Sequence, residues 1–228
     1  MSLKTSAWIV ALILGVAPAT LLAAGQPLTP QAVLFDARHL DQVGKGSEVT
    51  YKFERTTSNE TILGKSFADS IKLGVNKIGD KGEREVVFKV FTGEQAREPT
   101  TFPDLSINPI MVWYFERSVN TFSSLAGGNY NYLKKKLIDE LQKSAEVEAI
   151  KFDYNGKSID ALRIAIRPYA DDVSASKMQG YESSQFTIVV SNDAPGYIVD
   201  LSSVFESKSA TAPRLEEHIS LVGIGENK

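Results

Sequence analysis

EVTYKFE, residues 48–54, is the stretch that decides the fold. Large apolar residues at positions 49, 51 and 53 alternate with charged or hydroxyl side chains, and this period of two is typical of a strand with one buried face. A second segment with the same period, residues 67–75, predicts the partner strand of a hairpin. The register that matches the apolar faces pairs Val49 with Val75, Tyr51 with Leu73 and Phe53 with Ile71.

The same register places two opposite charges on the apolar face of the hairpin. Arg55 lies opposite Asp69, among large apolar neighbours. Because an unpaired buried charge costs several kcal/mol, we expect the two side chains to neutralise each other. The pair has two interpretations. It is an ion pair that fixes the hairpin register, or it is the polar end of a pocket that holds the head group of a ligand.

Strand and turn signals continue along the chain. Asn155-Gly156 is a strong two-residue turn, and it predicts a hairpin that begins near residue 147. The cross-strand pairs of this hairpin are Phe152 with Ile159, Lys151 with Asp160 and Glu148 with Arg163. Further strands are expected at 85–91, 185–191, 197–204 and 215–222, with Val190 opposite Tyr197 and Ile188 opposite Val199. Hairpin spacing makes the sheet antiparallel, and one apolar face per strand predicts that it curls around one interior.

Three segments have the period of a helix. The first spans residues 29–40 and starts with Thr29 as N-cap. The second starts with Asn108 as N-cap and Pro109 at the first helical position, and it runs to about residue 125. The third starts near Asn131, with Leu133, Leu137, Ile138 and Leu141 as its buried stripe. We therefore predict an α+β fold, mainly antiparallel β, in which a curled, incomplete barrel of about eight strands carries an N-terminal helix and two inserted helices.

Six consecutive large apolar residues, 110–115, lie within the second helix. A helix that is apolar all round must be covered on all sides. It is either a core helix that fills the interior of the sheet, or a helix that lines or covers a hydrophobic pocket. Under the pocket interpretation, the ligand-binding residues are Ile110, Trp113, Tyr114, Phe122, Tyr51, Phe53, Ile71 and Leu73, with Arg55 and Asp69 at the polar end.

Residues 1–24 have the layout of a cleaved signal peptide. Lys4 precedes an apolar stretch at 7–17, and Pro18 and a small-residue segment at 23–25 follow. The alternative is an uncleaved membrane anchor, because residues 7–24 are about long enough to span a bilayer. Pro18 and the small residues favour cleavage. We predict that residues 25–228 form a single β-rich domain in a Gram-negative periplasm, without a stable membrane anchor.

Composition argues against most classes of chemical site. The chain has no cysteine, which excludes disulfides, a lipid-modified cysteine and a cysteine nucleophile. Only His39 and His218 are available as imidazole bases or metal ligands, and both are expected at the surface. The formal net charge of −3 is spread without a basic patch, which argues against a nucleic-acid partner. We predict no enzyme activity, no metal and no cofactor.

The order of the elements resembles the periplasmic lipoprotein-carrier superfamily of the LolA and LolB type. The shared features are a signal peptide, an opening helix, β-hairpins, two inserted helices and a closing antiparallel run. In that superfamily an incompletely closed barrel, capped by helices, shelters acyl chains, so the resemblance implies a lipid or a lipidated protein as partner. The resemblance is limited to the order of the elements, so no functional residue of that superfamily is assigned to this sequence. The phrases at 114–118 and 128–132 are also similar to those of uncharacterised exported alphaproteobacterial proteins.

Two functions follow from these patterns. The first is a non-enzymatic periplasmic protein that binds an apolar or acyl-chain ligand in a pocket of the curled sheet. The alternative is a structural or interaction protein of the cell envelope, with a packed core and no ligand. An apolar cavity beside the second helix would distinguish the first from the second.

Overall fold

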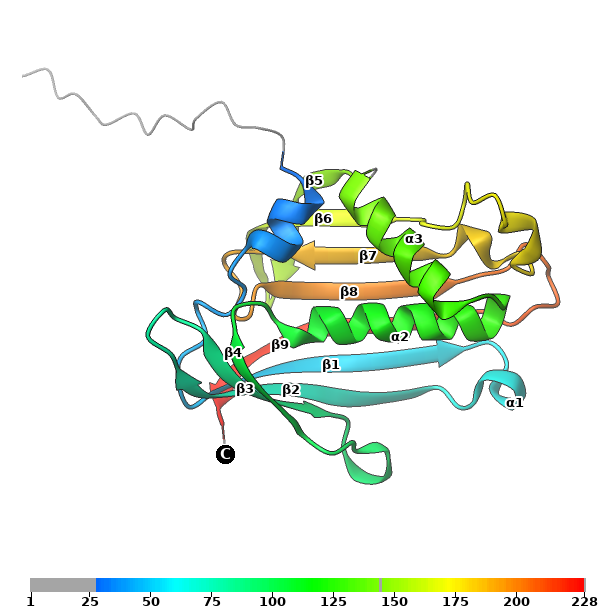
Figure 1. Cartoon of the computed structure of the whole chain (residues 1–228). Coiled ribbons are helices and arrows are strands. Elements are labelled where there is room, and N and C mark those ends of the chain that lie inside the picture. The colour runs from blue at the N-terminus through cyan, green and yellow to red at the C-terminus, as the bar shows by residue number, and fades with distance from the viewer. Residues whose placement is uncertain (1–27, 144, 228) are drawn as a thin grey trace, which may run out of the picture.

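A single antiparallel sheet of nine strands dominates the computed structural model, which describes residues 28–143 and 145–227 (Figure 1). The strands are β1 (Ser47–Thr57), β2 (Phe67–Ile78), β3 (Arg84–Val90), β4 (Thr100–Leu105), β5 (Val147–Tyr154), β6 (Lys157–Ile166), β7 (Gln185–Val190), β8 (Ile198–Phe205) and β9 (Leu215–Glu226). Their order is β4-β3-β2-β1-β9-β8-β7-β6-β5, so β4 and β5 are the open edges. The sheet is therefore curled but not closed, as predicted, and β4 is the strand that was not expected. The predicted signal peptide, 1–24, lies outside the described residues.

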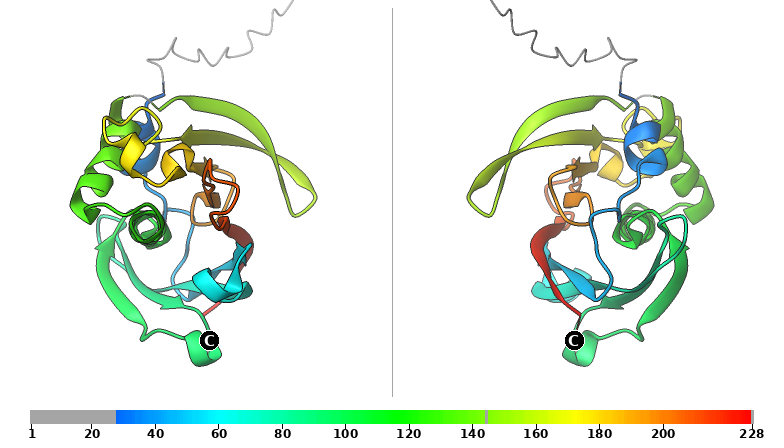
Figure 2. Two further views of the ribbon diagram at one scale, coloured as in Figure 1. Left: turned by 90° about the vertical axis from the view of Figure 1, so that its right-hand side faces the viewer. Right: turned by 90° about the vertical axis from the view of Figure 1, so that its left-hand side faces the viewer.

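Two long helices cover the concave face of the sheet. α2 (Pro109–Ala126) lies along this face, and α3 (Tyr130–Lys143) packs beside it. Figure 2 shows the sheet curling around α2, with β3 and β4 at one end of the curl and the β5–β6 hairpin at the other. The shorter helical segments are Ala32–Asp36, α1 (Glu60–Leu63), Gly93–Gln95, Ala175–Lys177 and Tyr181–Ser183. Within the described ranges, no helix is both long and apolar enough to span a lipid bilayer.

α2 begins where the sequence predicts. The Oδ1 of Asn108 accepts a hydrogen bond from the Ile110 backbone N–H at 3.1 Å and so caps the helix. The Nδ2 of the same side chain donates to the Tyr51 hydroxyl at 2.7 Å and to the Gly196 carbonyl at 2.9 Å. Asn108 is fully buried. The cap therefore also anchors the start of the helix to β1 and to the turn before β8.

The β1–β2 hairpin is shifted by two residues from the predicted register. Phe53 pairs with Asp69, and Arg55 pairs with Phe67, so the predicted Arg55–Asp69 pair is wrong. A one-residue slip moves every side chain to the opposite face, but a two-residue slip leaves each on its own face. The apolar pattern therefore cannot detect this shift.

In the observed register Asp69 has partners other than Arg55. Its carboxylate accepts hydrogen bonds from the Thr92 backbone N–H, the Thr92 hydroxyl and the Ser70 N–H. The segment that connects β1 and β2 contains the short helix α1, whose N-cap is the Asn59 side chain. Burial of the Asp69 carboxyl opposes the effect of these bonds, but the bonds outweigh it and lower its pKa.

The β5–β6 hairpin has the predicted register. Lys151 pairs with Asp160, and Glu148 pairs with Arg163. Asn155 and Gly156 have φ angles of 53° and 74°, which is the geometry of a tight two-residue hairpin turn. The turn fixes the register because it leaves no unpaired residue between the two strands other than Asn155 and Gly156.

The β7–β8 register differs from the prediction. Val190 pairs with Ile198 instead of Tyr197, and Ile188 pairs with Leu201 instead of Val199. The register shifts between Val189 and Val190, where a β-bulge adds an unpaired residue. The predicted register is therefore wrong by one residue at Val190, next to the turn, and by two residues beyond the bulge.

The first helix is shorter than predicted. The Oγ1 of Thr29 accepts a hydrogen bond from the Ala32 N–H at 3.2 Å near its start, but the helix ends at Asp36. Beyond this point the chain turns toward the start of α2, where the Leu40 N–H donates to the Ser106 carbonyl. His39 is consequently buried, at 2% exposure, and not at the surface. Its Nδ1 accepts from the Asn108 N–H at 3.2 Å.

Candidate functional site

Two adjoining cavities open along one side of α2, and together they are named the α2 groove. The larger has a volume of about 950 Å³ and lies between the C-terminal half of α2, the end of β1, α1 and the loops before β7 and β9. The smaller has a volume of about 390 Å³ and lies between the start of α2 and strands β3 and β4. Arg97, Trp113 and Glu116 line both cavities, so the two meet at these residues. Both volumes are in the range of roughly 300–1,000 Å³ that is typical of small-molecule sites.

The smaller cavity is mainly apolar. Alternation along β3 places Phe88 and Val90 on the concave face, opposite the first turns of α2. The other hydrocarbon residues of its wall are Phe102, Leu105, Ile107, Pro109, Val112 and Trp113. Val112 is 47% exposed and lies at the rim. This cavity can remove an apolar chain from water without a rearrangement of the core.

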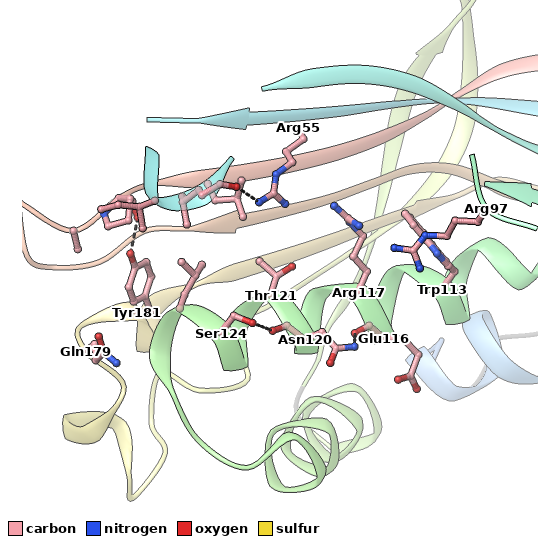
Figure 3. A pocket seen from close by; sticks show the side chains of 16 residues that line it. Arg55, Arg97, Trp113, Glu116, Arg117, Asn120, Thr121, Ser124, Gln179 and Tyr181 are labelled. Carbon is pink, nitrogen blue, oxygen red and sulfur yellow. Dashed lines mark hydrogen bonds between the residues drawn. The ribbon is translucent and has the colours of Figure 1, made fainter. Parts of the chain in front are cut away.

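The larger cavity is polar and contains guanidinium groups. Arg55 extends from β1 and Arg117 from α2, and both point into the same space, with Arg97 at the end nearest Trp113 (Figure 3). The rest of the polar lining consists of the Glu116 carboxylate and of hydroxyl and amide side chains, namely Asn120, Thr121, Ser124, Gln179 and Tyr181. The arrangement is suited to hydrogen bonding with a polar or charged group.

A buried carboxylate joins two of these arginines. Arg117 donates from Nε to Glu217 Oε2 at 2.9 Å and from Nη2 to Oε1 at 2.6 Å. Arg55 donates from Nη1 to the same Oε1, and from Nη2 to the Leu63 carbonyl at 3.0 Å. The Glu217 side chain is only 4% exposed. Two cations share one anion, so the cluster keeps an excess positive charge.

Aromatic rings surround Arg117. Its guanidinium carbon lies 4.9 Å from the ring centre of Phe53, 5.4 Å from that of Trp113 and 5.9 Å from that of Phe91. Such contacts favour the cation and hold it in one place. Phe91 has a φ of 65°, a left-handed conformation that is rare for a bulky residue. Strained backbone of this kind is concentrated at functional sites.

The other charges of the groove differ in their partners. Glu116 forms an ion pair with Lys134 and accepts a hydrogen bond from the Tyr130 hydroxyl. The guanidinium of Arg97 has no ion-pair partner within residues 28–143 and 145–227, and this side chain is exposed. Glu98 lines the smaller cavity only.

The predicted pocket residues separate into two groups. Trp113 and Arg55 line the groove. The remaining apolar candidates are fully or almost fully buried in the core, and none of them lines either cavity: Ile110, Tyr114, Phe122, Tyr51, Phe53, Ile71 and Leu73. Asp69 also lies outside both cavities.

Packing and hydrogen bonds explain why these residues are in the core. The Tyr114 hydroxyl donates to the Ser202 carbonyl of β8 at 2.6 Å, and Phe122 stacks on Tyr169 with ring centres 4.0 Å apart. The Tyr114 side of α2 therefore faces the sheet, and the Phe122 side faces the segment that follows β6. The groove lies on the neighbouring face of the helix, where Trp113 and Arg117 point.

Sequence reasoning missed Glu217, Arg117 and Arg97. The sequence contains a signal for Glu217, because alternation along the strand places it on the same face as the buried Leu215, Ile219 and Leu221. A carboxylate in an apolar register needs a buried cation. No comparable signal marks Arg97, which lies in an irregular segment between β3 and β4.

Histidines and carboxylates do not gather into a metal centre in the part of the chain that the structure describes. His218 lies on β9, half exposed, as predicted, and bonds to the Asp200 carboxylate. That hydrogen bond raises the pKa of His218. His39 lies beside Tyr197 and the start of α2, and it lines neither cavity of the groove.

Comparison with known proteins gives a likeness in structure and none in sequence. No protein-family model matches the sequence, and no curated protein matches it. Among solved structures, the chain is similar to a LolA superfamily protein from Nitrosomonas europaea. The two are 8% identical, the match covers 88% of this chain and 94% of that chain, and the TM-score is 0.22.

Proposed function

We propose that this protein is a non-enzymatic binding protein of the periplasm that holds an apolar or acyl-chain ligand in the α2 groove. The supporting observation is the smaller cavity, about 390 Å³ in volume, with walls formed mainly by aliphatic and aromatic side chains. Each Å² of apolar surface removed from water contributes roughly 25 cal/mol to binding, before the cost of immobilising the ligand. A lipid or a lipidated protein is the partner that fits this chemistry.

Trp113 marks the ligand position in this proposal. It lines both cavities and is only partly buried, so a chain in the smaller cavity contacts its indole. The seven core residues form the layer behind the groove. A ligand therefore occupies space that is already present and does not displace α2 from the sheet.

The test uses the full chain with the substitution Trp8→Phe, which leaves Trp113 as the only tryptophan of the two in the sequence. The probe is monopalmitoylglycerol, a neutral amphiphile, kept below its aggregation concentration. The expected result is a saturable shift of the tryptophan emission, because the apolar chain replaces water at the indole.

A pair of matched substitutions locates the binding site. Val112→Arg places a charge at the rim of the smaller cavity and should weaken binding at least about tenfold, equivalent to about 1.4 kcal/mol. Val173→Arg makes the same change at a residue that is 93% exposed and lines neither cavity, and it should leave binding unchanged. No emission change on titration, together with no lipid in the purified protein, would overturn the proposal and favour the packed envelope protein.

A further inference from the structure

We infer that the ligand of the α2 groove is an amphiphile with an anionic head, and that Arg55, Arg97 and Arg117 bind the head in the larger cavity. The shared chemistry of such heads is a carboxylate or a phosphate oxyanion. The inference rests on the proposed function, because it places the head relative to an apolar chain in the smaller cavity.

The charge balance of the larger cavity favours an anion. Glu217 neutralises only one of the two arginines that it contacts. Glu116 is offset by Lys134. Arg97 adds a further positive charge to the larger cavity and forms no ion pair with a carboxylate among the described residues. The cavity therefore has an excess of two positive charges, one from the Glu217 cluster and one from Arg97.

Unused hydrogen-bond donors on Arg55 and Arg117 also favour an anionic ligand. A guanidinium has five N–H donors. For each of Arg55 and Arg117, two hydrogen bonds to described residues are present, so more than half of the donors remain for a ligand. A planar guanidinium binds a carboxylate or phosphate through two parallel bonds, which is stronger and more selective than a single contact.

Burial and rigidity strengthen this site. The side chains of Arg55 and Arg117 are 15% and 20% exposed, so their attraction to an anion is screened less than at the surface. The rings of Phe53, Phe91 and Trp113 and the carboxylate of Glu217 fix the position of Arg117 before any ligand arrives. Preorganisation of this kind reduces the entropy cost of binding.

The junction of the two cavities sets the orientation of the ligand. Arg97 and Trp113 lie where the apolar cavity meets the polar one, so a chain that leaves the smaller cavity passes Arg97 first. Glu98 lines the smaller cavity and repels an anion there. The chain therefore lies beside β3 and β4, and the head lies toward Arg55 and Arg117.

The experiment compares three probes with the same acyl chain, using the full chain with Trp8→Phe. The probes are palmitate, palmitoyl lysophosphatidic acid and the neutral monopalmitoylglycerol. We expect the tighter of the two anionic probes to bind at least tenfold more tightly than the neutral one, with an advantage that falls as the salt concentration rises. The identity of that probe assigns the head as a carboxylate or a phosphate.

Variants of Arg97 test the role of the arginines without disturbing the buried cluster. Arg97→Gln should reduce affinity for the preferred anionic probe by threefold or more and leave the neutral probe unchanged, and Arg97→Lys should restore part of the loss. Arg163→Gln removes the same charge from an exposed pair outside the groove and should change neither affinity. Equal affinities for all three probes, unaffected by Arg97→Gln, would overturn the inference and leave the proposed function intact. If no probe binds, the proposed function fails and the inference falls with it.

Discussion

Arg117 and Glu217 form a two-point ion pair between α2 and β9, with N···O distances of 2.9 and 2.6 Å. The same carboxylate accepts a hydrogen bond from Arg55 on β1. One buried side chain thus connects the long helix to two neighbouring strands of the sheet.

Replacing this carboxylate should destabilise the fold. Glu217→Gln leaves two partly buried arginines close together without their anion. Removal of one partner of a buried pair typically costs about 3–5 kcal/mol, and the residual exposure of the arginines places our expectation near 3 kcal/mol. Urea unfolding at neutral pH measures the loss.

The adjacent residue supplies the matched control. Glu216 points to the opposite face of β9, where it forms an ion pair with Arg214 and is 38% exposed. Exposed pairs contribute about 0–1 kcal/mol, so Glu216→Gln should have little effect. Similar losses for the two variants would contradict the assignment of Glu217 to the buried cluster.

His39 should make the fold sensitive to mild acid. Burial lowers the pKa of His39 from 6.5 to about 4. Because the unfolded chain binds this proton at a higher pH than the folded chain, stability should fall as the pH decreases from about 6.5 toward 4. The difference in pKa corresponds to roughly 3 kcal/mol in total.

The substitution His39→Gln removes the titration and retains a hydrogen-bond acceptor for Asn108. Urea unfolding of both proteins at pH 7 and pH 4.5 gives the difference in their pH dependence. The wild type should lose about 2 to 3 kcal/mol more than the variant over this interval. Parallel losses in the two proteins would show that His39 is not protonated on unfolding.

The contact between Asn108 and Tyr51 should show coupling. Asn108→Ala removes the helix cap and leaves the Tyr51 hydroxyl and the Gly196 carbonyl without this donor, at an expected cost of about 2–4 kcal/mol. Tyr51→Phe alone should cost about 1 kcal/mol. The double variant should be more stable than the sum of the two losses predicts, because the second change removes a contact already lost. Strict additivity in thermal or urea unfolding would mean that the two side chains do not interact.

Phe122 and Trp113 should separate stability from binding. Phe122 is fully buried and stacked on Tyr169, so Phe122→Ala should cost about 3–5 kcal/mol of stability. Trp113 is partly exposed in the groove, so Trp113→Ala should cost less stability. It should nevertheless weaken the binding of monopalmitoylglycerol, measured by calorimetry, more than Phe122→Ala does at a temperature where both variants are folded. The reverse order would place the ligand in the core.

The sequence predicts the elements of this fold better than their registers. The cap at Asn108 and the turn at Asn155-Gly156 are local signals, and both are confirmed. The β1–β2 register is not predictable from alternation, since a two-residue shift preserves both faces. The sequence did not predict β4 because Pro103 interrupts its pattern. Proline in a sheet is confined to edge strands and bulges, and β4 is an edge strand.

The groove was less predictable than the fold. The apolar run at 110–115 indicates that the helix is covered, but only the rotation of α2 shows that Tyr114 faces the sheet and that Trp113 faces the groove. The arginines of the groove come from β1, from α2 and from the segment before β4. Their convergence depends on tertiary structure, which no local pattern encodes.

β9, the last strand that the structure describes, lies in the interior of the sheet between β1 and β8. Strands β1–β4 pair among themselves, as do β5–β8, and β9 alone joins the two sets. A chain that emerges from the ribosome in order therefore holds two separate half-sheets, each with an unpaired edge, until residues 215–226 arrive. Pairing across such a long stretch of chain is slow and leaves these edges exposed in the meantime. The two sets of strands can therefore form one sheet only after residues 215–226 have been synthesised, so β9 is the strand on which closure of the fold depends.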